Sequence, residues 1–330
     1  MGYFCAFAHD PISTVMASLS LRSRNQRLSA DRAPKVRCRE IGPADLAGVA
    51  ELLASGFPGR SREYWTRALT RLSNRPTPPA FPRYGYLLES EELSVGALLL
   101  IYSSIHERGR ELVRCNVSSW HVQPAFKAFA PMLVSRALKH PEVTYFNVTP
   151  AQHTLPILEA QGYTKYCDGS LLTLPWLSAP LPKASVEQVA PGMLTGLPVE
   201  EEELLLRHAS YGCMSLCCGA DDGVFPFVFA ACRASARRGF APYARLIYCR
   251  ALADFARFAR PLGVFLARRG LPMVLLDSNG SIPRLRGIYF RNRPKYFKGP
   301  RRPRLGDLAD SELALFEGDV GGSSRRLFAS

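Results

Sequence analysis

The chain of 330 residues is long enough for about two domains of ordinary size. Its hydrophobic content of 47% and charged content of 21% exclude a wholly disordered chain, and no apolar run reaches the roughly 18 to 20 residues of a membrane-spanning helix. The 42 Lys and Arg residues against 28 Asp and Glu give a formal net charge of +14, which indicates an anionic partner or a basic surface.

Residues 1–34 differ in composition from the rest of the chain. The segment 18–32 is rich in Ser and Arg and holds few core-forming residues, which predicts a flexible N-terminal arm. Its basic composition also fits a transit peptide, and Met16 is an alternative start, so the role of the arm stays open. Because an export signal is absent and the cysteine count of nine is odd, we expect reduced thiols and a cytoplasmic protein.

The first part of the chain predicts strands and amphipathic helices. Residues 36–41 form a predicted strand, followed by a helix that Gly56 ends. Ser61 is a suitable N-cap for a second helix, and the Pro-rich segment 75–82 prevents its continuation. Next come two strands, at 84–90 and 95–105.

The stretch from 112 to 163 predicts strand, helix, strand and helix. Residues 112–122 are rich in β-branched and aromatic side chains and form the predicted central strand, and Pro124 stops it. Apolar residues at spacings of three and four predict an amphipathic helix at 125–139. A buried strand at 143–148 and a helix that Gly162 closes complete the stretch. A strand that runs straight into a helix leaves the first amides of the helix facing outward, where they attract phosphate.

The junction Val122-Gln-Pro-Ala-Phe-Lys-Ala-Phe-Ala-Pro-Met-Leu133 resembles the acyl-CoA-binding segment of the GNAT superfamily of acyltransferases. The residues that match in kind are Val122, Pro124, Lys127, Ala128 and Ala130. The resemblance implies that the backbone amides of residues 127–130 hold the pyrophosphate of CoA, and that the strand end at Trp120 diverges from its neighbour to admit the pantetheine arm. The cofactor-binding residues that it implies are Trp120, Val122, Lys127, Ala128, Phe129 and Ala130.

The usual catalytic groups of that family do not stand at their places in this chain. Leu158 occupies the position of the frequent Tyr acid, and no carboxylate follows Glu111 on the central strand. The nearest proton acceptors are His121, at the strand end, and His153, before the second helix, and Ser119 is placed to orient a water. We therefore predict His121, His153 and Ser119 as the catalytic residues, although His121 also fits a packing role beside Trp120.

A segment rich in Pro and Gly at 179–198 is a predicted linker, after which a second series of helices and strands begins. Beyond it, we predict a helix at 199–211, strands at 213–218, 224–230 and 244–249, a helix at 251–270 and a strand at 272–277. Three short echoes repeat the first half at a spacing of about 130 residues, which indicates a duplicated domain. They pair residues 125–131 with 254–261, 143–147 with 274–278, and Lys165-Tyr166 with Lys295-Tyr296.

These elements predict an α/β (α+β) fold with two GNAT-like lobes, each a mixed, mainly antiparallel sheet flanked by helices. Residues 35–178 form the predicted acyl-CoA-binding lobe, closed by a strand at 171–177, and residues 199–318 form a degenerate second lobe. Residues 319–330 are a predicted flexible tail. The run 289–307 also resembles the tail of bacterial proteins called acyl-CoA acyltransferases.

The remaining polar features favour no metal and no nucleic acid. Cys213, Cys217 and Cys218 have only His208 nearby, so we predict no metal site. Aromatic residues interleave with the Arg-rich stretch 284–304, a pattern that single-stranded nucleic acid sites share, but a basic surface is the favoured interpretation. The sequence leaves the oligomeric state open.

We predict an acyltransferase that moves an acyl group from acetyl-CoA or another acyl-CoA to an amine or hydroxyl of a small molecule or peptide. The alternative is a binding protein with a degenerate GNAT fold, which holds an anionic polymer or a protein partner on its basic surface.

Overall fold

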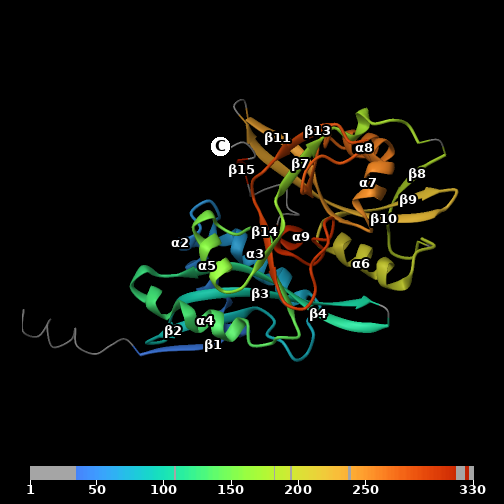
Figure 1. Ribbon diagram of the computed structural model, residues 1–330. Helices are drawn as coiled ribbons and strands as arrows, with labels where there is room; N and C mark the ends of the chain where they lie inside the picture. The colour runs from blue at the N-terminus through green and yellow to red at the C-terminus, as the bar shows by residue number, and fades with distance from the viewer. Residues whose placement is uncertain are drawn as a thin grey trace, which may run out of the picture.

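The computed structural model describes residues 35–107, 109–181, 183–193, 195–236, 239–316 and 324–326. The predicted arm at 1–34 lies outside the described residues, as does the predicted tail at 319–330 apart from residues 324–326. The chain forms two lobes, each built on one β-sheet (Figure 1). Among the described residues, no helix combines the length and the apolar character that a bilayer crossing requires.

The first lobe is built on a mixed sheet that contains one parallel pair, β4 and β5, among antiparallel neighbours. Its strands lie in the order β1 (Val36–Glu40), β2 (Gly85–Ser90), β3 (Leu93–Glu107), β4 (Arg110–Val122), β5 (Thr144–Asn147), β14 (Lys295–Lys298) and β6 (Thr164–Cys167). Successive side chains of β3 point to opposite faces, so Ala97, Leu99 and Ile101 join one core and Leu98, Leu100 and Tyr102 another.

Helices cover both faces of this sheet. On the face of Leu99 lie α2 (Leu46–Gly56), which follows the 3-10 helix η1 (Pro43–Asp45), and α3 (Arg62–Asn74). On the face of Leu98 lie α4 (Ala130–Ala137), preceded by η2 (Pro124–Phe129), and α5 (Leu155–Ala160), preceded by η3 (Gln152–Thr154). Ser61 caps α3 as predicted, since its hydroxyl accepts from the Tyr64 amide at 3.3 Å.

The second lobe is also mixed, with β11 and β12 as its parallel pair. Its strands lie in the order β13 (Gly287–Phe290), β7 (Gly169–Thr173), β12 (Val274–Ser278), β11 (Gly239–Cys249), β10 (Gly223–Ala236), β9 (Met214–Ala220) and β8 (Ser185–Gln188), and β15 (Ser324–Arg326) pairs with β10. Its helices are η4 (Pro175–Leu177), α6 (Val199–Ser210), α7 (Leu252–Arg257), α8 (Ala259–Ala267) and α9 (Glu312–Leu315). The predicted helix at 251–270 is therefore broken at Phe258.

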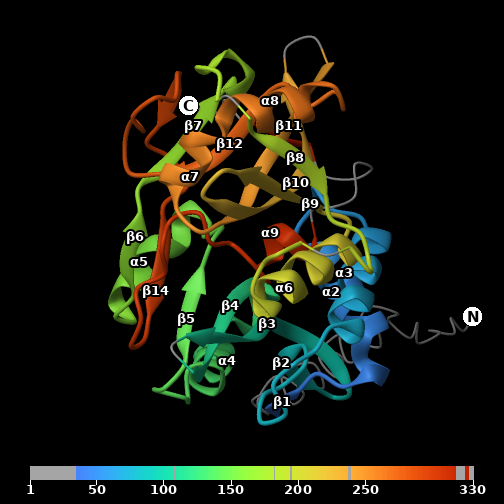
Figure 2. The same cartoon turned by 90° about the vertical axis from the view of Figure 1, so that its right-hand side faces the viewer.

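The two lobes exchange a strand. Strand β7 comes from the first half of the chain but lies between β12 and β13 in the second sheet, and β14 comes from the second half but lies between β5 and β6 in the first. Figure 2 shows β14 beside β6 in the lower lobe and β7 in the upper one. The prediction that 171–177 closes the first sheet was wrong, because β7 finds its partners across the lobe boundary.

Apart from β15, the two sheets share one arrangement of strands, with one parallel pair in each. In each lobe a long strand runs into helices and returns as a short parallel strand, β4 to β5 in the first and β11 to β12 in the second. The echoes at 143–147 and 274–278 therefore lie on equivalent strands. The echo of Lys165 and Lys295 does not, because β6 and β14 are neighbours in one sheet, whereas the counterpart of β6 is β13.

Candidate functional site at the divergence of β4 and β5

The parallel strands β4 and β5 diverge halfway along β4. Pairing between them ends at Asn116 and Phe146, whereas β4 stays paired with β3 as far as Val122 and Gly96. Within the described chain, residues 117–122 therefore have no strand partner on the β5 side. An unpaired strand edge of this kind exposes backbone donors and acceptors that a ligand can pair with.

A bulge shapes β4 at this divergence. The partners of Ala97 and Leu99 are His121 and Ser118, so two residues of β4, Ser119 and Trp120, stand opposite one residue of β3. Ser119 has φ +50°, a left-handed conformation that is uncommon for residues other than glycine. A bulge redirects the side chains around it, which allows adjacent residues of β4 to serve different sides of the site.

A carboxylate from the far end of the chain lies between the two diverging strands. Glu312, the first residue of α9, is 4% exposed. Its side-chain oxygens accept hydrogen bonds from the hydroxyls of Ser118 on β4 and Thr149 just after β5. Its amide donates to Asn116 Oδ1 at 2.8 Å, and Asn116 Nδ2 donates to the Phe146 carbonyl at 3.1 Å. Glu312 thus bridges the two strands where they separate.

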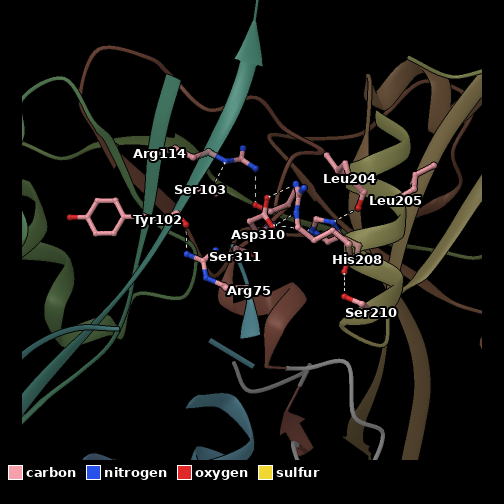
Figure 3. A network of polar contacts seen from close by, with 12 residues as sticks. Arg75, Tyr102, Ser103, Arg114, Leu204, Leu205, His208, Ser210, Asp310 and Ser311 are labelled. Carbon is pink, nitrogen blue, oxygen red and sulfur yellow. Dashed lines mark hydrogen bonds and ion pairs between the residues drawn. The ribbon is translucent and has the colours of Figure 1, made fainter. Parts of the chain in front are cut away.

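The segment that carries Glu312 is held by charged groups from both lobes. The guanidinium of Arg114 on β4 donates to the Asp307 carboxylate at 3.0 Å and to the Ala309 carbonyl at 2.8 Å. Arg207 on α6 makes a two-bond contact with Asp310, each bond 3.1 Å long (Figure 3). These bonds fix the chain immediately before Glu312, so the position of its carboxylate is set by both lobes.

The buried His208 completes this anchor in its neutral form. Its Nδ1 donates to the Leu204 carbonyl at 2.7 Å, and its Nε2 accepts the Asp310 amide proton at 3.0 Å. One ring nitrogen donates and the other accepts, which assigns the neutral tautomer. Burial lowers the pKa of His208 below its ordinary value of 6.5.

Of the three predicted catalytic residues, Ser119 lies in the Glu312 network. Its hydroxyl is 2.9 Å from that of Ser118, which in turn donates to Glu312. His121 lies at the same strand end, and its ring packs 6.3 Å from that of Phe57 at the C-terminal end of α2. Burial and the charge of Lys127 lower the pKa of His121, which keeps the imidazole neutral and able to accept a proton at pH 7. His153 lies in η3 and is exposed.

The predicted cofactor-binding residues line the other side of β4. Trp120, Phe129 and Ala130 pack on the apolar core beneath α4, and Val122 belongs to that core. The indole Nε1 of Trp120 is buried without a hydrogen-bond partner, so a donor is left over at the diverging strand. This orphaned donor and the unpaired edge fit an amide-bearing arm such as pantetheine. Lys127 and Ala128 are exposed on η2.

The segment expected to hold pyrophosphate differs from the prediction in its winding. Residues 124–129 form a 3-10 helix and the α-helix begins only at Ala130, instead of one helix over 125–139. The Phe126 amide donates to the Gln123 carbonyl at 2.9 Å, and the Ala130 amide donates to the Lys127 carbonyl. Because a 3-10 helix uses its amides for i to i+3 bonds, few of these amides are free for a phosphate. The exposed ammonium of Lys127 is the group that remains suited to one.

Metal-binding groups do not gather anywhere in the described part of the chain, where no three His, Cys, Asp or Glu residues stand in an arrangement that could hold an ion. The described cysteines are free thiols, and all of them except Cys38 are buried. Burial raises the pKa of Cys115, on the central strand, so its thiol is protonated and packs as a core residue.

Sequence reasoning missed Glu312. It stands 194 positions beyond Ser118, and nothing in its local sequence distinguishes it from a surface residue at the start of a short helix. Only its burial and its contacts with both strands reveal it. The sequence analysis considered carboxylates on the central strand only. The fold instead places Glu312, from the C-terminal part of the chain, beside that strand.

Comparison with known proteins agrees with this architecture. No family model and no curated protein matches the chain. Among solved structures, the chain is similar to a putative acetyltransferase from Pyrococcus horikoshii, with a TM-score of 0.52 and 10% identity over 88% of this chain and 97% of that one. It is also similar to a GCN5-related N-acetyltransferase from Anabaena variabilis, with a TM-score of 0.50 and 11% identity over 80% and 72% of the two chains.

A third neighbour is the glucosamine N-acetyltransferase region of a fungal multi-domain GH3 β-N-acetylglucosaminidase. The TM-score is 0.51 and the identity 10%, over 81% of this chain and 38% of that one. At such identities the likeness shows the fold alone.

Proposed function

We propose that this chain, which has the two-lobed GNAT fold, is an acyl-CoA-dependent acyltransferase that acylates an amine or hydroxyl of a small molecule or peptide. The observation that carries the proposal is the buried Glu312 carboxylate held by two hydroxyls between the diverging strands β4 and β5. A proton acceptor at an open strand edge would accelerate transfer from a thioester to an amine, because the amine loses a proton in that reaction.

The residues around the divergence would hold the donor. The edge of β4 over residues 117–122 and the Trp120 indole would bind the pantetheine arm, and Lys127 would face the phosphates. The amides of η2 are used in hydrogen bonds within the 3-10 helix. The side chains of Ala128, Phe129 and Ala130 would therefore contact the donor, and their amides would contribute little. When bound, acyl-CoA supplies an activated acyl group as its thioester.

Glu312 would take the proton that the acceptor amine loses as its nitrogen bonds to the acyl carbon. The carbon–sulfur bond of the thioester would break in the same transfer, and the sulfur would leave as the thiolate of CoA. Ser118 and Thr149 keep the carboxylate in place, and Ser119 extends the hydroxyl chain toward the bulge. His121 is the second candidate for the same role, because its lowered pKa leaves it neutral at pH 7. Holding donor and acceptor together supplies much of the rate, since effective molarities for well-aligned groups are large.

The test is a calorimetric titration of the full chain with acetyl-CoA. We expect saturable binding in wild type and weaker binding in Lys127→Glu, which places like charge beside phosphate. Lys139→Glu is the matched control, because it makes the same charge change at another exposed position past the end of α4. An absence of binding by wild type at millimolar acetyl-CoA would show that the acyltransferase proposal is wrong.

One observation favours a second candidate, a binding protein that has lost acyl transfer. The 3-10 winding of η2 consumes amides that a pyrophosphate would use. If acetyl-CoA does not bind while a polyanion such as heparin does, in a salt-dependent manner, the net charge of +14 serves a binding role instead.

A further inference from the structure

A cavity lies on the seam between the lobes, beside the part of β4 and β5 that is still paired. This cleft of about 1320 Å³ is bounded by the loop after α3, the paired strands β3 and β4, the helix α6 and residues 300–304. Arg114 on its floor and Ser118 at the candidate active site are four residues apart on β4, or about 13 Å at the rise of an extended strand. The cleft is therefore a separate place in the molecule.

Two of the ion pairs on the floor of the cleft are balanced. Arg114 pairs with Asp307 at 3.0 Å, and Arg207 pairs with Asp310 at 3.1 Å. The neighbouring His208 is neutral, as its two hydrogen bonds require. These groups contribute no net charge. Four further arginines line the cleft, and of these Arg75 is buried whereas Arg301, Arg302 and Arg304 are exposed.

The buried Arg75 makes no ion pair in the described chain, although the charge of Asp310 attracts it from beyond ion-pair distance. It is the C-cap residue of α3, is 3% exposed and lines the cleft. One guanidinium nitrogen donates to the Tyr102 carbonyl oxygen, and Nε is buried without a hydrogen-bond partner (Figure 3). A neutral carbonyl does not compensate a buried cation, and burying an unpaired charge is costly. Burial lowers the pKa of Arg75, yet a guanidinium stays protonated in proteins.

A second unsatisfied group lies two residues away. The hydroxyl oxygen of Thr77 is buried without a hydrogen-bond partner, and Thr77 also lines the cleft. Two buried polar groups left unpaired beside one cavity are unusual in a folded protein, where such groups nearly always find partners. A guanidinium and a hydroxyl together are a typical donor set for an oxyanion.

We propose that Arg75 and Thr77 bind the oxyanion of a small ligand in the interlobe cleft, a carboxylate or a phosphate group. The oxyanion pairs directly with the buried guanidinium and accepts from both unsatisfied groups. The ligand is small because exposed carboxylates of α6, Glu200 and Glu203, line the cleft as well and repel a polyanion. This proposal does not depend on acyl transfer, and direct measurement of anion binding tests it.

The experiment titrates the full chain with inorganic phosphate and, separately, with succinate in a chloride-free buffer, monitored by calorimetry. We expect saturable binding of one of the two, which identifies the ligand as a phosphate or a carboxylate. Arg75→Met should weaken that binding at least tenfold, and Thr77→Val should weaken it to a smaller extent. The matched control is Arg302→Met, which removes a charge from the exposed rim of the same cleft and should leave binding within about twofold of wild type.

A stability measurement separates ligand binding from a purely structural role. Without an anion, Arg75→Met removes an uncompensated buried charge, so its thermal midpoint should equal or exceed that of wild type. The bound anion should raise the midpoint of wild type and not that of Arg75→Met. The proposal is wrong if neither anion binds, if Arg302→Met weakens binding as much as Arg75→Met, or if Arg75→Met is less stable than wild type without an anion.

Discussion

At the scale of single residues, the candidate active site depends on one carboxylate that reaches across the chain. Glu312 accepts from Ser118 and Thr149, and its amide is fixed by Asn116. Its backbone and its side chain are therefore both held before any substrate arrives. Such preorganisation is what a proton acceptor needs in order to act without reorganising its surroundings.

Replacing this carboxylate tests its role directly. We expect Glu312→Gln to keep the hydrogen bonds of the site and lower kcat by about a hundredfold or more, because an amide cannot accept the proton. KM for acetyl-CoA should change little. The control is Glu111→Gln, on the exposed start of the same strand, and equal activity of the two variants would contradict the assignment.

The alternative acceptor, His121, predicts a different pH profile. Because its pKa is lowered from 6.5, its neutral form is present at and above neutral pH and is lost as the pH falls through that lowered value. If His121 accepts the proton, kcat/KM of wild type falls as the pH drops through that lowered pKa. His121→Gln should abolish this pH dependence and lower turnover at least tenfold. If turnover stays within tenfold in both His121→Gln and His153→Gln, neither histidine is the base.

At the scale of elements, α6 and the segment before α9 act as one unit. Arg207 and His208 on α6 hold Asp310, two residues before Glu312. Burial raises the pKa of Asp310, but the charges of Arg207 and Arg114 and the hydrogen bonds from Arg207 favour the ionised carboxyl, and the pKa is lowered below its ordinary value of 3.8. A helix of the second lobe thereby positions a residue in the candidate site of the first.

This unit makes stability depend on pH. The pKa of buried His208 is below 6.5, so the unfolded chain binds more protons than the folded chain as the pH drops below 6.5. Stability is therefore full above that pH and is lost below it, at about 1.4 kcal/mol for each unit by which the pKa is lowered. Asp310 contributes to stability in a lower pH range. Its pKa is lowered in the folded chain, so its contribution is lost only as the pH falls below 3.8.

Urea denaturation at pH values from 5 to 7.5 measures this effect. We expect His208→Gln, which can still donate and accept, to have a flatter profile than wild type over that range. His140→Gln is the control at a side chain that is 24% exposed. A profile for His208→Gln as steep as that of wild type would show that another group is responsible.

At the scale of the whole molecule, the exchange of β7 and β14 makes the lobes one folding unit. Each sheet needs a strand from the other half of the chain, between β5 and β6 in one case and between β12 and β13 in the other. Lys295 on β14 and Asp277 on β12 add an ion pair across the two sheets, 2.9 Å apart and both side chains 2% exposed. Asp277 Oδ1 is nonetheless without a well-aligned hydrogen bond, so the contact is mainly electrostatic.

A double-mutant cycle tests this link between the lobes. Lys295→Met alone leaves the Asp277 carboxylate buried without a cation and should cost about 3–5 kcal/mol of unfolding free energy. The double variant with Asp277→Leu replaces both charges by apolar groups and should recover most of that loss. Strictly additive effects in the cycle would mean that the two residues are not coupled.

Much of the fold could be predicted from sequence because its signals are local. The β-branched and aromatic residues of 112–122, the periodic apolar residues in helices and the Ser61 cap predicted β4, α2, α3 and the fold class of two sheet-based lobes. The junction after Val122 indicated the GNAT fold, and the echo of 143–147 in 274–278 indicated the duplication. Each of these features except the echo lies within a few dozen consecutive residues, and the echo is visible because its two copies are similar in sequence.

What only the tertiary structure decided depends on contacts between residues far apart. The register of β7 and β14 follows from strand edges in the other lobe, the bulge at Ser119 from pairing with β3, and the place of Glu312 from Arg114 and Arg207 acting on Asp307 and Asp310. A local pattern carries no information about which distant edge or charge a segment will meet. The sequence alone therefore determined the kind of lobe and its number, and the packing of one lobe on the other determined which carboxylate lies in the site.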